Sequence, residues 1–127
     1  MCLDENKQIT EPIGWQVAID CYDCDSSIIN DIESIKEIIQ QTCNLIGAKI
    51  VLDNYYLFEP YGISAYAIIT TSHISVHTWP EYKFASIDLF SCTGKLTPEV
   101  VNCIQDNLRA QTVEVQCFNR GKRRMDI

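Results

Sequence analysis

The sequence predicts an α+β fold: a two-layer sandwich in which an antiparallel sheet carries two helices on one face. Segments with the period-two pattern of strands and segments with helical periodicity follow one another in the order strand, helix, four strands, helix, strand. The connections between them are short, which favours antiparallel pairing of neighbouring strands. The chain has 127 residues, enough to bury one core, so we expect a single domain over residues 1–127.

The first strand and the first helix come from the start of the chain. "GWQVAIDCY" alternates apolar and polar residues from Trp15 to Cys21, which is typical of a half-buried strand. Asp25 and Ser26 then offer N-cap side chains, and Gly47 offers a C-cap. Between them the apolar residues recur at three- and four-residue steps: Ile28, Ile29, Ile32, Ile35, Ile38, Ile39, Thr42, Cys43 and Ile46. This spacing predicts an amphipathic helix of about five turns.

The middle and the end of the chain supply the other elements. "KIVLDNYYLF" and "SAYAIITT" have the composition of strands, and "EPYG" between them has the chemistry of a turn. "HISVHTW" and "FASIDLFSC" follow, joined by "PEYK" around Pro80, and the residues from Ile74 to Val76 support the strand assignment. "TPEVVNCIQDNLRA" is the second helix, with Thr97 as its N-cap and Pro98 at its first position. "TVEVQCF" is the last strand.

Composition and charge disfavour several classes of function. The chain is 46% hydrophobic and 21% charged, the balance of a folded globular protein. Its net charge of −7 disfavours a nucleic-acid partner, because phosphates require a positive surface, and the basic run "RGKRR" at 120–124 is interpreted as a solvated tail. No apolar run reaches the ~18 residues of a membrane helix, and the start "MCLDENKQITEP" is too polar for a signal peptide. We therefore expect a cytoplasmic protein without a membrane partner.

The cysteines and histidines do not predict a metal site. The seven cysteines are odd in number, which favours reduced thiols over a disulfide framework. Cys21 and Cys24 form a lone C-x-x-C that lacks both the second pair of a zinc ribbon and the context of a redox motif, so a structural role is favoured. His73 and His77 are four residues apart in an expected strand, where this spacing separates their backbones by about 13 Å, too far for one zinc ion.

One stretch, "TTSHISVHTWPEYKFASIDLFSC", gathers several reactive side chains. From the residues alone it is either an ordinary strand pair or a site with Ser72 or Cys92 as nucleophile and His77 as base, and each signal by itself is weak. In order and spacing, "YGIS", "TSHISVHTWPEY" and "ASIDLFSC" resemble the core of the prokaryotic S-adenosylmethionine decarboxylase family. The resemblance covers most of the chain, from "GWQVAIDCYDCD" through the isoleucine-rich helix and "LFEPYGIS" to the closing helix and strand.

The resemblance implies an enzyme that makes its own cofactor by cutting its chain. The family's processed serine corresponds to Ser72, so the cut is expected between Thr71 and Ser72 and leaves a pyruvoyl group on the new N-terminus. In the family that group forms a Schiff base with the substrate amine and withdraws electrons as carbon dioxide leaves. Ser64 and His77 match the family's helpers of self-processing, and Cys92 matches its proton donor in decarboxylation.

The resemblance also implies a substrate, S-adenosylmethionine, whose decarboxylation feeds polyamine (spermidine) synthesis. Phe58 matches the family's aromatic residue that stacks on adenine, and Glu81 matches the carboxylate that binds the ribose hydroxyls. Thr71 stands where the family usually has glutamate, and Tyr56 and Leu57 stand where basic residues are common.

These departures keep alternatives open, and the resemblance also implies an assembly. Members of this family are thought to have diverged to decarboxylate arginine or ornithine, so these basic amino acids are the alternative substrates. A non-catalytic regulatory relative is a third hypothesis. The family assembles as a dimer with residues of both subunits near each site, so a homodimer of cleaved protomers is expected.

Overall fold

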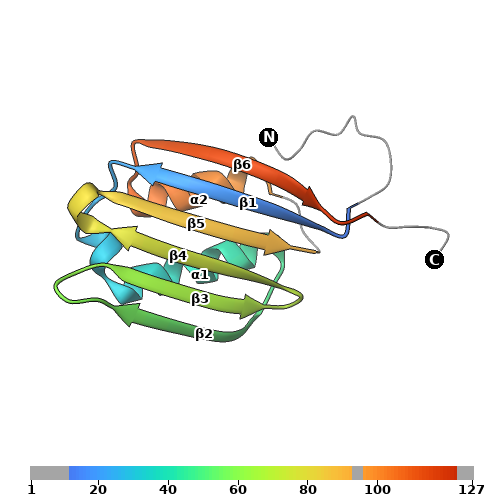
Figure 1. Cartoon of the computed structure of the whole chain (residues 1–127), viewed down its shortest axis with the longest axis horizontal. Coiled ribbons are helices and arrows are strands. Elements are labelled where there is room, and N and C mark those ends of the chain that lie inside the picture. Colours follow the sequence, from blue (N-terminus) through green and yellow to red (C-terminus); the bar gives the residue numbers. More distant parts are fainter. Residues whose placement is uncertain (1–11, 93–95, 123–127) are drawn as a thin grey trace.

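The chain folds as one antiparallel sheet with helices packed against it, in the residues that the computed structural model describes, 12–92 and 96–122 (Figure 1). The strands are β1 (Gly14–Tyr22), β2 (Ile50–Leu57), β3 (Ile63–Ile69), β4 (Ser72–Trp79), β5 (Phe84–Ser91) and β6 (Thr112–Arg120). The α-helices are α1 (Ile32–Ile46) and α2 (Pro98–Leu108), and 3-10 turns lie at Ile28–Asn30 and Pro80–Tyr82. The order across the sheet is β2-β3-β4-β5-β1-β6, and every neighbouring pair is antiparallel.

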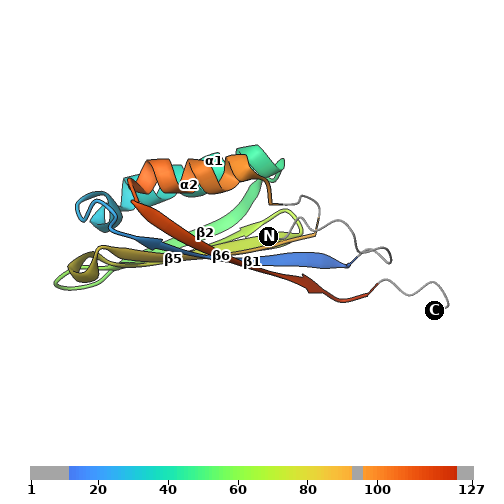
Figure 2. The ribbon, with the colours of Figure 1, turned by 90° about the horizontal axis from the view of Figure 1, so that it is seen from above.

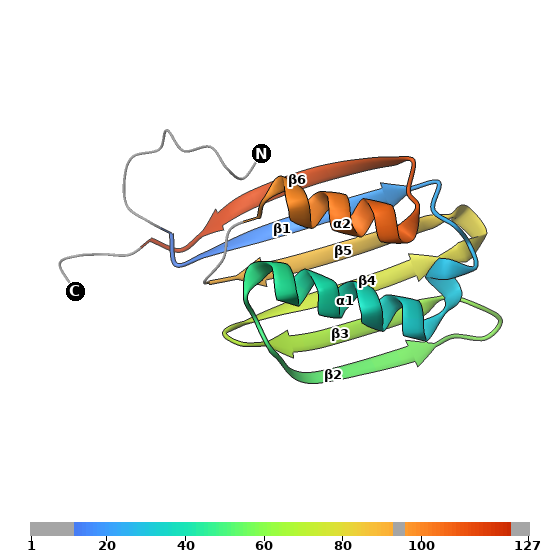
Figure 3. The ribbon, with the colours of Figure 1, turned by 180° about the vertical axis from the view of Figure 1, so that it is seen from behind.

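The molecule has two layers, which confirms the predicted fold class. Both α-helices lie on one face of the sheet, and within the described residues no element covers the other face (Figures 2 and 3). β5 shows how the sequence produces this arrangement: Ala85, Ile87 and Leu89 are buried under the helices, while Ser86 and Asp88 alternate with them on the open face.

The core is built mainly from isoleucines on the inner face of the sheet and on the facing sides of the helices. The largest fully buried side chains include Ile19, Ile29, Ile35, Ile38, Ile39, Ile63, Ile69, Ile74, Ile87, Ile104 and Leu108. Burial of one such side chain is worth about 1.5–3 kcal/mol. Both α-helices present one apolar face to this core, and among the described residues no helix is long and apolar enough to cross a membrane.

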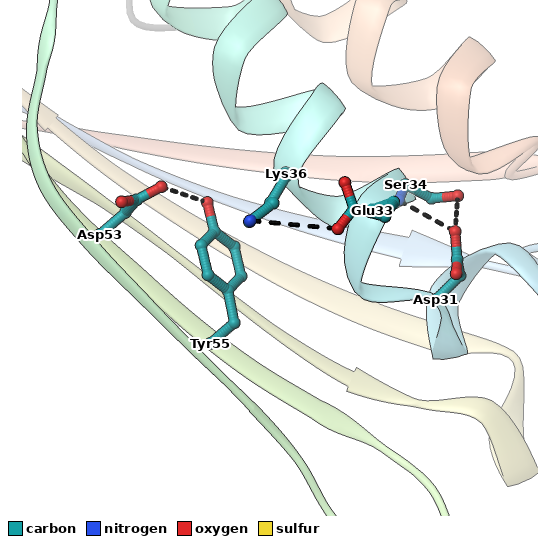
Figure 4. Close-up of polar contacts among 6 residues, drawn as sticks. All are labelled: Asp31, Glu33, Ser34, Lys36, Asp53 and Tyr55. Atoms are coloured by element: carbon teal, nitrogen blue, oxygen red, sulfur yellow. Dashed lines mark hydrogen bonds and ion pairs between the residues drawn. The ribbon is translucent and has the colours of Figure 1, made fainter.

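The first α-helix begins later than the sequence predicts. Asp25 does not cap it: the Asp25 carboxylate accepts from the backbone N–H groups of Ser27 at 2.9 Å and Ile28 at 3.2 Å, at the start of the 3-10 turn. Asp31 is the true N-cap, because its backbone is extended and its carboxylate accepts from the Ser34 N–H at 3.0 Å and hydroxyl at 2.7 Å (Figure 4). The α-helix has 15 residues, about four turns rather than five.

The first turns of α1 also hold the edge strand β2. The Lys36 ammonium lies 5.4 Å from the centre of the Tyr55 ring, a cation–π contact, and the Tyr55 hydroxyl donates to Asp53 at 2.9 Å (Figure 4). Burial, followed by the hydrogen bond to Asp53, raises the pKa of the Tyr55 phenol. The exposed pair of Lys36 and Glu33, at 4.0 Å, adds little. These contacts fix the strand that leads into the loop carrying Phe58.

Replacing the helix cap tests the observed start of α1. Asp31→Ala removes the acceptor for two donors of Ser34 and is expected to lower the free energy of unfolding by about 1 kcal/mol in urea denaturation. Asp31→Asn keeps a side-chain oxygen and serves as the matched control, with a loss of a few tenths of a kcal/mol at most. Equal stabilities of the two variants would contradict the assignment of Asp31 as the cap.

Candidate active site

The turn between β3 and β4 brings three of the predicted residues together. Ile69 pairs with Ser72, so Thr70 and Thr71 form a two-residue loop, and β5 ends next to the start of β4. The Cys92 N–H donates to Ser72 Oγ at 3.0 Å, and Cys92 Sγ donates to the Thr71 carbonyl oxygen at 3.1 Å. Cys92 therefore contacts both the hydroxyl and the carbonyl of the predicted cleavage site.

Two other predicted residues form a second pair. Ser64 on β3 lies directly opposite His77 on β4, and Ser64 Oγ is 2.8 Å from His77 Nδ1. Both side chains point to the open face of the sheet, because they alternate with the buried residues Ala65 and Val76. A serine hydroxyl bonded to an imidazole is an arrangement suited to moving a proton.

The predicted substrate residues lie beside this pair. One cavity of about 320 Å³ is lined by Phe58, Tyr61, Ile63, Ser64, His77, Thr78, Trp79 and Glu81. Phe58 is 46% exposed, and its ring meets that of Tyr56 edge-on with the centroids 4.7 Å apart. The cavity thus combines an accessible aromatic ring, a carboxylate and the Ser64–His77 pair.

Two residues that position this cavity were missed from the sequence. The Asn30 side chain accepts from the Gly62 N–H at 2.8 Å, and the buried Thr78 hydroxyl accepts from the Ile63 N–H at 2.9 Å. These bonds hold the loop between β2 and β3 against the 3-10 turn that precedes α1 and against β4. Asn30 was hidden inside the helix expected from Asp25, and Thr78 inside a strand pattern, so no local signal marked either residue.

Within one chain the two groups of residues are far apart. Ser72 is the first residue of β4, and His77 comes five residues later along the same extended strand. At about 3.3 Å per residue, their backbones are separated by roughly 16 Å. One protomer therefore joins Ser72 to Cys92 and Ser64 to His77, but it does not bring His77 to Ser72.

The remaining cysteines have structural environments. Cys21 and Cys24 are buried, Cys24 Sγ donates to the Cys21 carbonyl at 3.6 Å, and burial raises the pKa of Cys21 to about 12 and that of Cys24 to about 11. Both thiols therefore stay neutral near pH 7 and are poor nucleophiles, as expected for a structural C-x-x-C. Free thiols are found at Cys21, Cys24, Cys43, Cys92 and Cys103. Cys117 is disulfide-bonded, which corrects the expectation of reduced thiols at that position.

The histidines do not meet at a metal ion. His73 lies on the open face between the rings of Tyr66 and Phe90, with centroid distances of 6.0 and 5.8 Å, while His77 bonds Ser64. In residues 12–92 and 96–122, no group of three His, Cys, Asp or Glu side chains is arranged to hold a metal ion.

Comparison with known proteins supports the resemblance noted in the sequence. A family profile described as S-adenosylmethionine decarboxylase matches residues 15–121. The S-adenosylmethionine decarboxylase proenzyme of Thermosipho africanus is 34% identical over 111 residues, which are 87% of this chain and 85% of the relative. The corresponding proenzyme of Thermoanaerobacter sp. is 36% identical over 110 residues, covering 86% of this chain and 89% of the relative.

A solved structure shares the fold over nearly its whole length. The crystal structure of the adenosylmethionine decarboxylase from Aquifex aeolicus superposes with a TM-score of 0.79 at 25% identity, covering 91% of this chain and 96% of the other.

Proposed function

Because this chain belongs to the S-adenosylmethionine decarboxylase family, we propose that it decarboxylates S-adenosylmethionine with a pyruvoyl group that it makes from Ser72. The decarboxylated product then supplies aminopropyl groups for spermidine synthesis. The observation that carries the proposal is the double contact of Cys92 with the Ser72 hydroxyl oxygen and the Thr71 carbonyl oxygen. Cys92 holds both the Ser72 hydroxyl oxygen and the carbonyl oxygen that precedes it. This arrangement fits the formation of a pyruvoyl group at the Thr71–Ser72 peptide bond.

These contacts support the proposed cut. Ser72 Oγ attacks the Thr71 carbonyl carbon, the C–N bond breaks, and the hydroxyl proton ends on the released nitrogen, so that an ester replaces the amide. During the attack the carbonyl oxygen becomes negative, and the Cys92 Sγ–H at 3.1 Å is a donor aimed at it. The Cys92 N–H fixes Ser72 Oγ from the other side, at 3.0 Å. β-Elimination from the ester then releases the Thr71 carboxylate and leaves dehydroalanine at position 72, and water hydrolyses its imine tautomer to the pyruvoyl group with release of ammonia.

Each chain's own residues have proposed roles in catalysis. When present, the pyruvoyl carbonyl supplies the electron sink that accepts the electron pair as carbon dioxide leaves. Cys92, beside residue 72, holds the proton that replaces the carboxyl group. Phe58 offers an aromatic face to adenine, and Glu81 offers a carboxylate to the ribose hydroxyls. The aromatic ring also suits the sulfonium cation of the substrate.

A homodimer reconciles the two groups of residues. We assign proton transfer during processing to the Ser64–His77 pair, yet His77 is roughly 16 Å from Ser72 in the same strand. A two-fold axis that stacks the open faces of two sheets, with strand directions reversed, carries the His77 end of one chain over the Ser72 end of its partner. The face of the sheet that no described element covers is available for such stacking (Figure 2). Each site then takes Ser72 and Cys92 from one chain and Phe58, Ser64, His77 and Glu81 from the other.

Self-cleavage is the first expectation. Purified protein should resolve by denaturing mass spectrometry into residues 1–71 and a fragment that starts with a pyruvoyl group at position 72. Ser72→Ala, which removes one hydroxyl and leaves a small side chain, should stay uncut and keep the parent's circular dichroism. A parent that stays full-length after long incubation would favour the non-catalytic alternative.

The substrate is tested through Phe58. If S-adenosylmethionine is bound by stacking, Phe58→Ala should lower its kcat/KM by the equivalent of about 1–3 kcal/mol, whereas Phe58→Tyr, which keeps the ring, should change it little. The alternative, left open by Thr71, is a decarboxylase of arginine or ornithine. Neither of these substrates has an adenine that Phe58 could stack on. A parent that decarboxylates arginine or ornithine and ignores S-adenosylmethionine would overturn the substrate while leaving the self-cleavage intact.

A further inference from the structure

Thr71 has an unfavourable backbone conformation for its residue type. Its φ is 63°, in the left-handed region, where Cβ crowds the following carbonyl oxygen and where a second branch on Cβ adds to the cost. The other described non-glycine residues with positive φ are Asp23, Lys83 and Arg109. Of these four described residues, Thr71 is the one with a β-branched side chain. It lies at the peptide bond that the proposed function cuts.

The surroundings of the turn prevent Thr71 from relaxing. On one side, the Thr70 N–H donates to the Lys49 carbonyl at 2.9 Å, and the Lys49 N–H donates to the Thr70 hydroxyl at 3.0 Å. On the other side, Ser72 pairs with Ile69 in the sheet and is bound by the Cys92 N–H. Strained backbone persists where its neighbours over-determine it, and both ends of this loop are tied to different parts of the fold.

The first chemical step loosens this loop. In the amide, one atom, the nitrogen, lies between the Thr71 carbonyl carbon and the Ser72 Cα. In the ester, two atoms, Oγ and Cβ, lie between them, because the C–N bond has been exchanged for a C–O bond and the proton has moved to nitrogen. The loop gains one atom of length while its anchors at Lys49 and Ile69 stay in place. After elimination Thr71 is a free chain end and its φ is no longer constrained.

We propose that Thr71 is a positioning residue for self-cleavage: its β-branched side chain raises the energy of the uncut turn, and ester formation releases that strain. The inference rests on the proposed cut at Ser72 and adds a reason for its rate. The same conformation aims the Thr71 carbonyl oxygen at Cys92 Sγ. Among the described residues, the hydrogen bond of the Thr71 hydroxyl runs backward, to the Thr70 carbonyl at 2.6 Å. The effect is therefore assigned to the branching of the side chain rather than to its hydroxyl.

The test compares two replacements of Thr71. Asparagine tolerates the left-handed region, whereas valine keeps the second branch on Cβ and lacks the hydroxyl. In pulse-labelled cell-free synthesis, Thr71→Val is expected to be cut about tenfold faster than Thr71→Asn. Asparagine relieves the strain of the uncut turn, and a more stable uncut chain has a higher barrier to ester formation. Equal cleavage rates, or a faster asparagine variant, would overturn the role of Thr71. If the parent is still cut in that case, the proposed function stands. An uncut parent would overturn both.

A second measurement separates strain from a direct chemical effect. In the Ser72→Ala background no cut occurs, so the two replacements report only on the stability of the uncut turn. Thr71→Asn should then melt a few degrees higher than Thr71→Val, because the strained state is relieved. An asparagine variant that cuts slowly without melting higher would show that the side chain acts through something other than strain, and this too would overturn the proposal.

Discussion

The antiparallel register of β3 against β4 is the constraint on which the whole site depends. It places Ser64 opposite His77 near one end of the pair and closes the two-residue loop between Ile69 and Ser72 at the other. The register is held by the apolar residues between these ends, because a slip by one residue would turn the buried Ile74 and Val76 to the open face. The same alternation that stabilises the sheet therefore decides which reactive groups meet.

Because β4 is long, the candidate site residues lie in two groups at opposite ends of the strand. Ser72 and Cys92 lie at one end of the strand pair β4–β5, and His77 lies toward the other end, beside Phe58 and Glu81. Neither end alone has all the groups that the proposed function assigns to self-cleavage and substrate binding. An open sheet face with no helix of the described residues above it offers the surface on which two copies can join unlike ends (Figure 2).

Much of this arrangement could be predicted from the sequence because it follows from local patterns. Alternation and helical periodicity predicted the elements and the layers. The block around Ser72, through its resemblance to a family, indicated the candidate site residues, whose roles stay predictions. The contact of Cys92 with Thr71 joins residues 21 apart in sequence and depends on how β4 and β5 align. Spacing along the chain does not contain that information.

The start of α1 and the backbone conformation of Thr71 could not be predicted from the sequence. Asp25 and Asp31 both have the chemistry of a helix cap, and the 3-10 turn that Asp25 starts ends before the α-helix that Asp31 begins. The positive φ of Thr71 was also hidden, because threonine is rare in that conformation and only the closed two-residue loop imposes it.

If each site is divided between two chains as proposed, co-expression of two defective variants restores self-cleavage. A Ser72→Ala chain and a His77→Ala chain carry different affinity tags and are purified through both tags in succession, so that only mixed dimers are analysed. In such a dimer one site combines an intact Ser72 with the partner's intact His77, and the other site has neither. The His77→Ala chain is expected to be cut in the mixed dimer and to stay uncut when expressed alone. A His77→Ala chain that is cut as fast alone as in the mixture, or a mixed dimer that stays uncut, would contradict a site divided between two chains.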